Sequence, residues 1–395
     1  MKYVFSLRDM NFQGGGMIRI KGLLTSIKAS GESCLFLNNT SSHEDGFEFV
    51  DLKFSSFEKK AFQFMLPLFP VFIVNMVFLF KYKALRNIAR KYQLFDKDVI
   101  FCEYLDISIG YFMKENKLIK DYICDIHGIV PVEFKGKKTN VIYNRLRYKI
   151  AVKLDTLVFS NASGVIYASE ALKSYMEVEY PSISDKKYMI LPYLISNTPK
   201  NVSSNDVKVL EIKDKYNISD DDFVILFAGS YKSIGGVFDL VRAYHLISNK
   251  KNRLILIGNG EDKSKVLEYI NKNNISESVV LIDRIDYSDL PIYQSLSSVI
   301  VCPDRMNIYS NLIVHLKYID SLSSNKVVIN GSFDSVLEFN HKDSLSLSFS
   351  PSDVADLADK IKYVIDNYDF LCDKYSNNKS YVDDNLTYYN YPFSI

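Results

Sequence analysis

Tryptophan is absent from the 395-residue sequence, and glycine (16), proline (10) and cysteine (5) are sparse. So few glycines and prolines exclude collagen-like and proline-rich chains. The cysteines are odd in number and form no CxxC pair, which argues against a disulfide framework and a zinc site. Reduced cytosolic thiols are the expected state of these side chains.

A strong net charge is also lacking, because 48 Lys and Arg face 47 Asp and Glu and leave a formal charge of +1. Nucleic-acid-binding proteins have a marked basic excess, so nucleic acid is not an expected partner. Hydrophobic residues make up 47% of the chain, which excludes a disordered protein. A chain of 395 residues exceeds what one hydrophobic core holds, and two domains are expected.

The near-neutral total hides two opposite halves. Residues 1–196 hold 27 Lys and Arg against 20 Asp and Glu, whereas residues 197–395 hold 21 against 27. In the first half, 81–91 carries five basic residues and 135–153 carries seven, and neither stretch contains an acidic residue. These stretches predict contact with an anionic membrane, at about 1 kcal/mol per basic residue. Solvated helix faces are the other interpretation.

One long apolar run covers residues 62–80 and is interrupted by Gln63, two prolines and Asn75. Its 19 residues approach the length needed to cross a bilayer. Three interpretations stay open: a spanning helix, a core helix after a proline-broken turn, and a helix lying in the membrane interface. A combination of the last two is favoured. The N-terminal apolar run is too short for a signal peptide.

Short apolar runs alternate with helical periodicity along the chain. The first half predicts strands at 1–7, 33–39, 98–104, 122–128, 164–169 and 188–193. A turn-rich linker begins at 196, and a second alternating series starts at 223. The last long helix is expected within 350–369, with Ser350 or Ser352 as its N-cap. This alternation predicts two doubly wound parallel sheets, which bind ligands beyond the carboxyl ends of their strands.

A triple glycine, 14–16, separates the first predicted strand from a helix. Glycine lets a backbone approach a ligand closely, and the helix N-terminus that follows favours negative charge. A simple flexible turn is the alternative.

A histidine and two carboxylates, Asp125, His127 and Glu133, lie within nine positions directly after another predicted strand. A histidine titrates near neutral pH and can polarise a sugar hydroxyl or a carbonyl. Glu133 can orient an acceptor hydroxyl or hold a cation. A hydrogen-bonded structural histidine is the alternative.

The second half contains three further motifs. The loop 227–236 combines glycines with Lys232, which suits a diphosphate at the N-terminus of the next helix. The segment 258–262 carries a GxG, a weak signal by itself. Lys317 and Asp320 are spaced i,i+3 and share one face of a predicted helix. An ordinary strand-to-helix loop and a solvated surface pair are the alternatives.

In their order and spacing, these motifs resemble the retaining glycosyltransferases of family 4, which have the GT-B fold. The resemblance runs from Gly14 to about Asp369. It implies two Rossmann-like domains facing across a cleft. The acceptor-binding domain is expected over 1–196 and the nucleotide-sugar-binding domain over 197–375, with 376–395 packing back on the first domain.

The resemblance implies transfer of a sugar from a nucleotide-diphosphate sugar to a glycan or lipid-linked glycan, with retention and without a metal ion or other obligatory cofactor. The implied donor-binding residues are Gly15, Gly16, Gly229, Lys232, Gly235, Gly260, Asn311 and Lys317. Asp320 is expected to bind the ribose and His127 the transferred sugar, and these two are the implied catalytic residues. Asp125 and Glu133 are expected to bind or orient the acceptor.

Several positions depart from the family pattern. Ser230 and Ile234 stand where the family has Arg and Lys, and Asp320 replaces a longer glutamate. Leu312 stands where the first acid of a pair is usual, so Asn311, Ser310 or Asp304 is expected to share its role. These departures keep open a catalytically silent, GT-B-like subunit of a polysaccharide-assembly complex.

The resemblance also places the chain in bacterial surface-polysaccharide assembly, such as that of capsule or O-antigen. A cytoplasmic protein on the inner face of the plasma membrane is the expected location. An integral membrane protein that uses 62–80 as a span is the third hypothesis.

Overall fold

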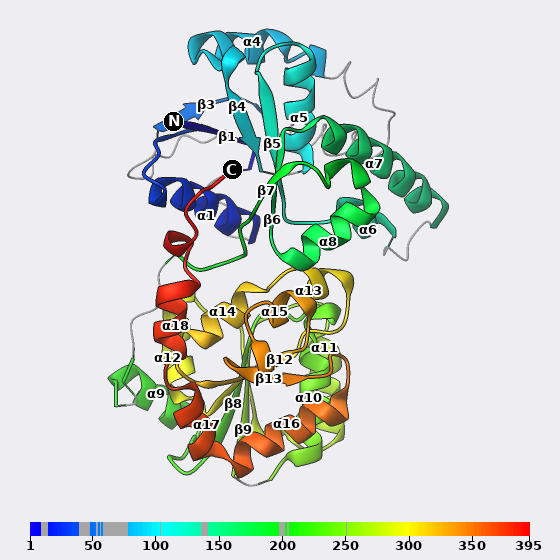
Figure 1. Ribbon diagram of the computed structural model, residues 1–395. Coiled ribbons are helices and arrows are strands. Elements are labelled where there is room, and N and C mark those ends of the chain that lie inside the picture. The colour runs from blue at the N-terminus through cyan, green and yellow to red at the C-terminus, as the bar shows by residue number, and fades with distance from the viewer. Residues whose placement is uncertain are drawn as a thin grey trace. The chain divides into compact units, whose positions relative to one another are not determined.

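The computed structural model describes residues 1–8, 15–38, 48–52, 54–55, 57, 78–102, 104–135, 141–196, 202–203, 205–249 and 251–395. The chain divides into two compact units, Met1–Tyr193 with Tyr388–Ile395, and Leu194–Thr387. Each unit is built on one sheet, of seven strands in the first and six in the second (Figure 1). The described strands pair in parallel throughout, which confirms two parallel-sheet α/β domains.

The first sheet has the strand order β3-β2-β1-β4-β5-β6-β7. Its strands are β1 (Lys2–Ser6), β2 (Cys34–Asn38), β3 (Glu48–Asp51), β4 (Asp98–Phe101), β5 (Asp121–Ile126), β6 (Gly164–Tyr167) and β7 (Lys187–Ile190). In the centre, Val4 lies opposite Phe36 of β2 and Ile100 of β4. The central strands are mostly apolar because helices cover both faces of the sheet.

The helices of this unit are α1 (Gly15–Ala29), α4 (Tyr82–Lys91), α5 (Tyr104–Glu115), α6 (Val130–Lys135), α7 (Val141–Asn161) and α8 (Glu170–Glu179). Figure 1 shows α1 on one side of the sheet and α5 and α7 on the other. Among the described residues, no helix is long and apolar enough to span a membrane. Residues 62–77 of the apolar run lie outside the described residues.

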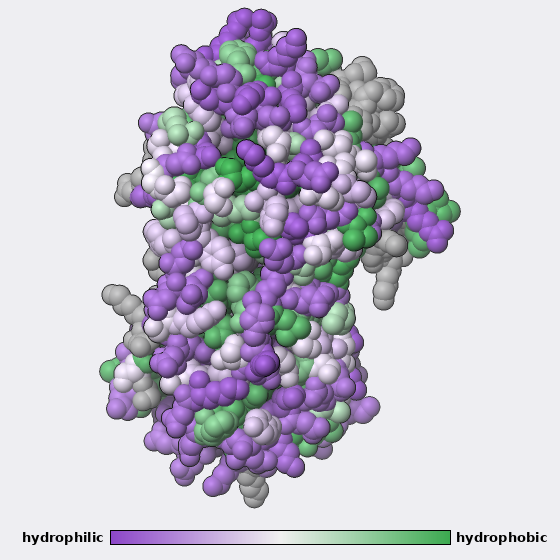
Figure 2. Space-filling view, viewed as in Figure 1, coloured by the Kyte–Doolittle hydropathy of each residue, from purple (hydrophilic) through white to green (hydrophobic). Residues whose placement is uncertain are grey.

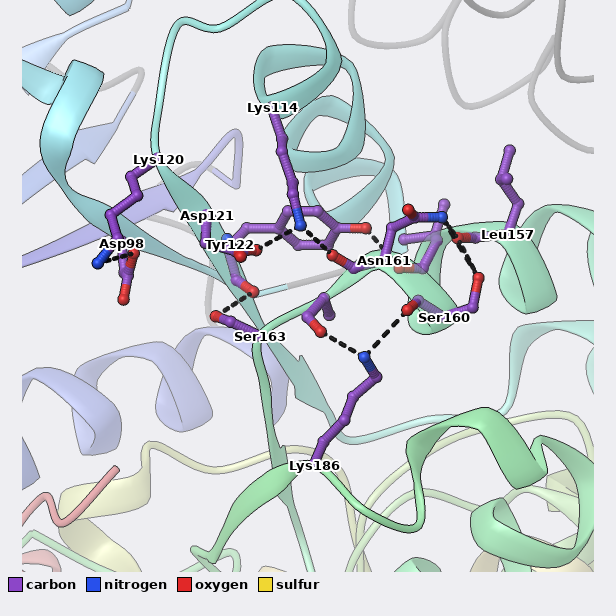
Figure 3. Close-up of polar contacts among 12 residues, drawn as sticks. Asp98, Lys114, Lys120, Asp121, Tyr122, Leu157, Ser160, Asn161, Ser163 and Lys186 are labelled. Atoms are coloured by element: carbon purple, nitrogen blue, oxygen red, sulfur yellow. Dashed lines mark hydrogen bonds and ion pairs between the residues drawn. The ribbon is translucent and has the colours of Figure 1, made fainter.

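Two lysines fix the C-terminal end of α7 (Figure 3). Lys186 Nζ donates to the carbonyl oxygens of Ser160 at 3.0 Å and Ala162 at 2.6 Å, and Lys114 Nζ donates to that of Asn161 at 2.6 Å. Cations at a helix C-terminus bind its unpaired carbonyl groups and complement its dipole. The C-terminal end of α7 is thereby tied to its neighbours in the first unit.

The second sheet has the order β10-β9-β8-β11-β12-β13. Its strands are β8 (Phe223–Ala228), β9 (Asn252–Ile257), β10 (Val279–Ile282), β11 (Val299–Cys302), β12 (Val327–Gly331) and β13 (Leu347–Phe349). The order reverses between β8 and β11, because the chain fills one side of β8 and then crosses to the other. Such a switch point is where open α/β sheets bind their ligands.

Helices cover both faces of this second sheet. They are α9 (Val207–Lys215), α10 (Val237–Ile247), α11 (Lys263–Lys272), α12 (Leu290–Leu296), α13 (Ile308–Leu312), α14 (Leu316–Leu322), α15 (Asp334–Leu337), α16 (Val354–Asp366), α17 (Tyr368–Tyr375) and α18 (Asn378–Asn385). One buried cluster joins the sheet to α10, α11 and α16, and another joins it to α9 and α12. Figure 1 shows α10 and α16 side by side.

The cap of α16 differs from the expected one. Asp353 has an extended backbone, and its carboxylate accepts the amide hydrogens of Ala355 and Asp356, each at 3.0 Å. The expectation of Ser350 or Ser352 as the N-cap is wrong. Ser352 has a left-handed backbone, with a φ of 70°, and the N-cap is the next residue, Asp353.

The C-terminal residues separate between the two units. Residues 376–387 belong to the second unit, where Asn378 Nδ2 donates to the Leu345 carbonyl at 2.7 Å. Residues 388–395 belong to the first, where the Phe393 amide donates to the Ser26 carbonyl at 3.1 Å. The packing on α1 is tight, because a Cβ at Gly22 would lie 2.0 Å from the ring of Tyr388.

Candidate functional site

Two glycine-containing loops of the second unit are joined at the carboxyl ends of β8 and β9. The Tyr231 amide donates to the Asn259 carbonyl at 3.0 Å, and the Asp262 amide donates to the Tyr231 carbonyl at 3.0 Å. A Cβ at Gly258, whose φ is 139°, would lie 1.9 Å from the Gly229 oxygen, and one at Gly260 would lie 2.7 Å from the Tyr231 oxygen. The two motifs 227–236 and 258–262 therefore form one surface, which needs glycine for its close backbone contacts.

The loop after β8 also meets the loop after β11, across the switch point of the sheet. Gly236 has a φ of 69°, and a Cβ there would lie 1.7 Å from the Pro303 oxygen. The Arg305 amide donates to the Ile234 carbonyl at 2.9 Å. Helix α10 begins directly after Gly236, so its N-terminus and residues 303–305 are close together.

Asp304 is a buried carboxylate with a lysine and a histidine as its partners. Lys317 Nζ lies 2.7 Å from its Oδ2 and His315 Nδ1 lies 3.1 Å from its Oδ1. Burial by itself raises the pKa of Asp304, but Lys317 and then His315 outweigh it and lower that pKa to about 2. Lys317 also lies over the ring of Phe227, 5.4 Å from its centroid. A Cβ at Gly229 would lie 3.1 Å from the same ring, which places Lys317 near the start of the glycine loop.

Asp320, on the same helix α14, has a different environment. Tyr287 donates its hydroxyl hydrogen to Asp320 Oδ1 at 2.5 Å. Burial raises the pKa of Asp320 to about 6, and the Tyr287 hydrogen bond offsets only part of that effect. The pKa values of these two carboxylates are thus shifted in opposite directions, because Asp304 contacts the cation of Lys317 whereas Asp320 contacts a neutral hydroxyl.

The other predicted residues of this unit form no hydrogen bond or ion pair with Asp304 or Asp320 among the described residues. Lys232 is exposed, and no ion pair involving it is found in the described part of the chain. Gly235 is buried, with its amide donating to the Lys232 carbonyl at 2.8 Å. Asn311 forms a reciprocal pair with Asp334: Nδ2 donates to the carboxylate at 2.7 Å, and the Asp334 amide donates to Oδ1 at 3.1 Å.

In the first unit, a buried ion pair lies at the carboxyl end of β5. Arg19 Nη2 is 2.6 Å from Asp125 Oδ1, and both side chains are fully buried. The guanidinium also donates to the carbonyl oxygens of Leu191 and Pro192. Burial by itself raises the pKa of Asp125, but Arg19 and His127 outweigh it and hold that pKa below its ordinary value of 3.8.

His127 is the accessible end of this arrangement. Its Nδ1 lies 3.5 Å from Asp125 Oδ2, and its side chain is 13% exposed. The ring also meets Tyr193 edge-on, with 6.1 Å between centroids. A carboxylate at Nδ1 favours the tautomer with its hydrogen on Nδ1, which leaves Nε2 to accept a hydrogen bond.

The remaining predicted residues of the first unit are less informative. Gly15 and Gly16 open α1, and Gly14 lies outside the described residues. Glu133 belongs to α6, and its side chain also lies outside the described residues. Within the described part, no group of three His, Cys, Asp or Glu side chains is placed to hold a metal ion. The five cysteines are free.

Sequence reasoning missed Arg19, Tyr287 and His315 as members of these clusters. One signal was available for Arg19: it stands four residues before Leu23 on the apolar face of α1, where both residues are fully buried. A cation on such a face needs a buried anion. No comparable local signal marks Tyr287 or His315, because their partners are distant in sequence.

Comparison with known proteins gives a family match within the second unit. Residues 208–381 match the model of the family described as "Glycosyl transferases group 1". These residues are similar to that family. The expectation of a glycosyltransferase is thereby confirmed. No curated protein matches the chain significantly.

Solved structures with the GT-B fold resemble the whole chain. Sucrose-phosphate synthase from Thermosynechococcus elongatus has a TM-score of 0.73 at 15% identity, with 98% of this chain and 94% of that chain covered. Anabaena HepE, in complex with UDP and glucose, has a TM-score of 0.68 at 11% identity, with 99% and 97% covered. WaaG, a glycosyltransferase involved in lipopolysaccharide biosynthesis, has a TM-score of 0.63 at 12% identity, with 99% and 97% covered. The GT-B fold is confirmed.

Proposed function

We propose that the glycosyltransferase transfers a sugar from a nucleotide-diphosphate sugar to a hydroxyl of a glycan or lipid-linked glycan, with retention. One observation carries the donor site: Asp304 holds Lys317 at the carboxyl end of β8, beside the glycine loop that precedes α10. Loop amides and a fixed cation at a helix N-terminus suit a diphosphate. The structure of HepE with UDP-glucose supports the same class of donor.

In the proposed reaction, the bond between C1 of the sugar and the diphosphate oxygen breaks, and a bond forms between C1 and the acceptor oxygen. The acceptor's hydroxyl proton leaves with the diphosphate, so no separate base is required. Lys317, Lys232 and the amides of loop 229–236 would stabilise the charge that develops on the leaving diphosphate. Asp320 would bind the ribose hydroxyls in place of its contact with Tyr287. His127 would accept a hydrogen bond from a sugar hydroxyl through Nε2.

The proposal is tested by a donor screen. The chain is incubated with UDP-, GDP-, CDP- and dTDP-sugars and candidate glycan acceptors, and the products are identified by mass spectrometry, with the anomeric configuration read by NMR. We expect one donor to give a product whose anomeric configuration at C1 is the same as that of the donor sugar. An inverted linkage would refute retention, and lack of binding to every nucleoside diphosphate in calorimetry would refute the donor site.

A second candidate function is a catalytically silent subunit that binds a nucleotide or a glycan. Ser230 and Ile234, which carry no charge, favour it, because the glycine loop itself then supplies Lys232 as its only cation. Calorimetry separates the two functions when it is combined with the donor screen. Tight binding of a donor with no transfer to any acceptor would favour the silent subunit.

We also propose that the first unit contacts an anionic membrane through α4 and α7, where a lipid-linked acceptor of surface-polysaccharide assembly would be met. On α7, Ile142 is 84% exposed and Leu146 is 54% exposed, and Arg145 and Lys149 are exposed on the same helix face. At the tip of α7, on the right of Figure 2, hydrophobic and hydrophilic side chains lie side by side. Such a mixed face suits a membrane interface.

Helix α4 contributes charge to the same proposal. Its exposed cations are Lys83, Arg86, Arg90 and Lys91, and Phe80, just before the helix, is 89% exposed. We expect flotation with liposomes that contain phosphatidylglycerol and little flotation with neutral ones. Lys149→Glu should reduce flotation, whereas Lys362→Glu, an exposed charge reversal on α16 of the second unit, should not. Equal flotation on neutral and anionic liposomes would refute this location.

A further inference from the structure

The proposed diphosphate site contains too few cations in its own loop. A nucleoside diphosphate carries two to three negative charges, whereas residues 229–236 contain a single basic residue, Lys232. Lys317 is shared with the Asp304 carboxylate, which neutralises part of its charge. Further positive charge must therefore come from a neighbouring element if the site is to balance its ligand.

Arg305 meets that requirement by position. Its amide donates to the Ile234 carbonyl at 2.9 Å, so its backbone runs beside the glycine loop. It lies two residues after Pro303, whose carbonyl oxygen packs against Gly236 at the start of α10. Its side chain is 42% exposed and can therefore reach a ligand.

One nitrogen of the Arg305 guanidinium contacts a carboxylate, and the other two nitrogens are available to a ligand. Its Nε lies 2.9 Å from Oδ2 of Asp239, a buried carboxylate in the first turn of α10. The N–H is not aligned for a hydrogen bond to that oxygen, so charge holds the pair. In the described part of the chain, neither terminal nitrogen of Arg305 has a hydrogen-bond or ion-pair partner. A guanidinium anchored through Nε presents these two nitrogens as a fork that fits phosphate oxygens.

Asp239 does not make this end of α10 unsuitable for an anion. Arg242 Nη1 lies 3.7 Å from its other oxygen, so two arginines share one carboxylate. Arg242 follows one turn into the helix, away from the N-terminus, and has no backbone contact with the glycine loop among the described residues. Both arginines therefore form an ion pair with Asp239, but only the backbone of Arg305 is hydrogen-bonded to the glycine loop among the described residues.

We propose that Arg305 binds the diphosphate of the donor through its two terminal nitrogens, and that Asp239 positions it. This inference rests on the proposed function, since it adds a residue to the same site. Arg305 would then contribute to the charge stabilisation of the leaving diphosphate along with Lys317 and Lys232.

The test compares two arginine variants by calorimetry against UDP, GDP, CDP and dTDP and the matching nucleosides. Arg305→Gln should weaken the Kd of the nucleoside diphosphate that binds wild type by about 10- to 100-fold, the range for a lost charged hydrogen-bond pair. It should leave the Kd of the corresponding nucleoside unchanged, because that molecule lacks the phosphates. Arg242→Gln, the matched control, should stay within about twofold for both ligands, and Arg305→Lys should recover part of the loss.

The outcomes separate this inference from the proposed function. If wild type binds a nucleoside diphosphate and Arg305→Gln binds it equally well, the inference is overturned while the proposed function stands. Equal losses of affinity for Arg305→Gln and Arg242→Gln would also overturn the inference. The loss of one positive charge anywhere near the site would then explain the weaker binding. If wild type binds no nucleoside diphosphate, both fail together. Unfolding temperatures of the variants verify that each one is folded.

The positioning role of Asp239 has its own readout. Asp239→Asn removes the charge that holds Arg305, so the diphosphate should bind several-fold more weakly while nucleoside binding is kept. In the double variant with Arg305→Gln, the Asp239 substitution should add no further loss, because the group it positions is gone. A full additional loss in the double variant would show that Asp239 acts independently of Arg305.

Discussion

Replacing Asp320 by asparagine should stabilise the protein and impair it at the same time. The Asp320 carboxyl is buried on α14 and accepts a hydrogen bond from the neutral hydroxyl of Tyr287. Burial raises its pKa from 3.8 to about 6, so the folded protein ionises this group reluctantly. Asparagine has nearly the same shape, can accept the Tyr287 hydrogen bond through Oδ1, and carries no charge.

The size of the effect follows from the two pKa values. The folded state binds the proton more tightly than the unfolded state, so the stability from this group is complete below about pH 3.8 and is lost as the pH rises through 6. The difference between 3.8 and about 6 corresponds to about 3 kcal/mol at 1.36 kcal/mol per pH unit. Roughly half of that, about 1 to 2 kcal/mol, is lost between pH 5 and pH 8.

The assay is urea unfolding of wild type and Asp320→Asn at pH 5 and pH 8, followed by circular dichroism. The variant's advantage in free energy of unfolding should be greater at pH 8 than at pH 5 by about 1 to 2 kcal/mol. Any pH-independent cost of the new amide cancels in this comparison. An advantage that is the same at both pH values would refute the raised pKa. In calorimetry, the variant should bind the donor nucleotide more weakly if Asp320 binds the ribose.

Three further outcomes follow from the packing. Arg19→Met should destabilise the first unit by about 3–5 kcal/mol in thermal unfolding, because it removes the guanidinium partner of the buried Asp125 carboxylate. An unchanged unfolding midpoint would contradict the buried pair. Gly236→Ala should lower stability sharply, since its φ is 69° and its Cβ would meet a carbonyl at 1.7 Å, whereas Gly128→Ala has open space and should be nearly neutral. Below about pH 4, wild type should lose about 2 kcal/mol as Asp304 is protonated towards its pKa of about 2, and Asp304→Asn should show no such acid dependence.

The secondary structure of the central sheets follows closely from local sequence. Strands buried on both faces are mostly apolar, and β1, β2 and β8 are therefore visible as short apolar runs. Strand β3 was not predicted, because it is a four-residue edge strand, EFVD, with one buried side chain. Its polar positions face solvent, so no apolar run marks it.

The candidate site was predicted only in part. The spacing of Lys317 and Asp320 indicated one helix, and both lie on α14. Their partners, Asp304 and Tyr287, lie 13 and 33 residues away in the sequence and reach them only because strands and helices return to the switch point. Lys317 and Asp320 were treated as a surface pair in one interpretation, yet each is bound to a different partner.

The sequence by itself determined two domains, their parallel sheets and the glycine-containing loops at the strand ends, because apolar alternation and glycine-containing turns are local properties. Tertiary structure alone decided which charges meet. It placed Arg19 on Asp125 and Arg305 on Asp239, and it gave Asp304 a low pKa and Asp320 a raised one. Ionisation depends on burial and on charges within a few ångströms, and both are set by residues far apart in the chain.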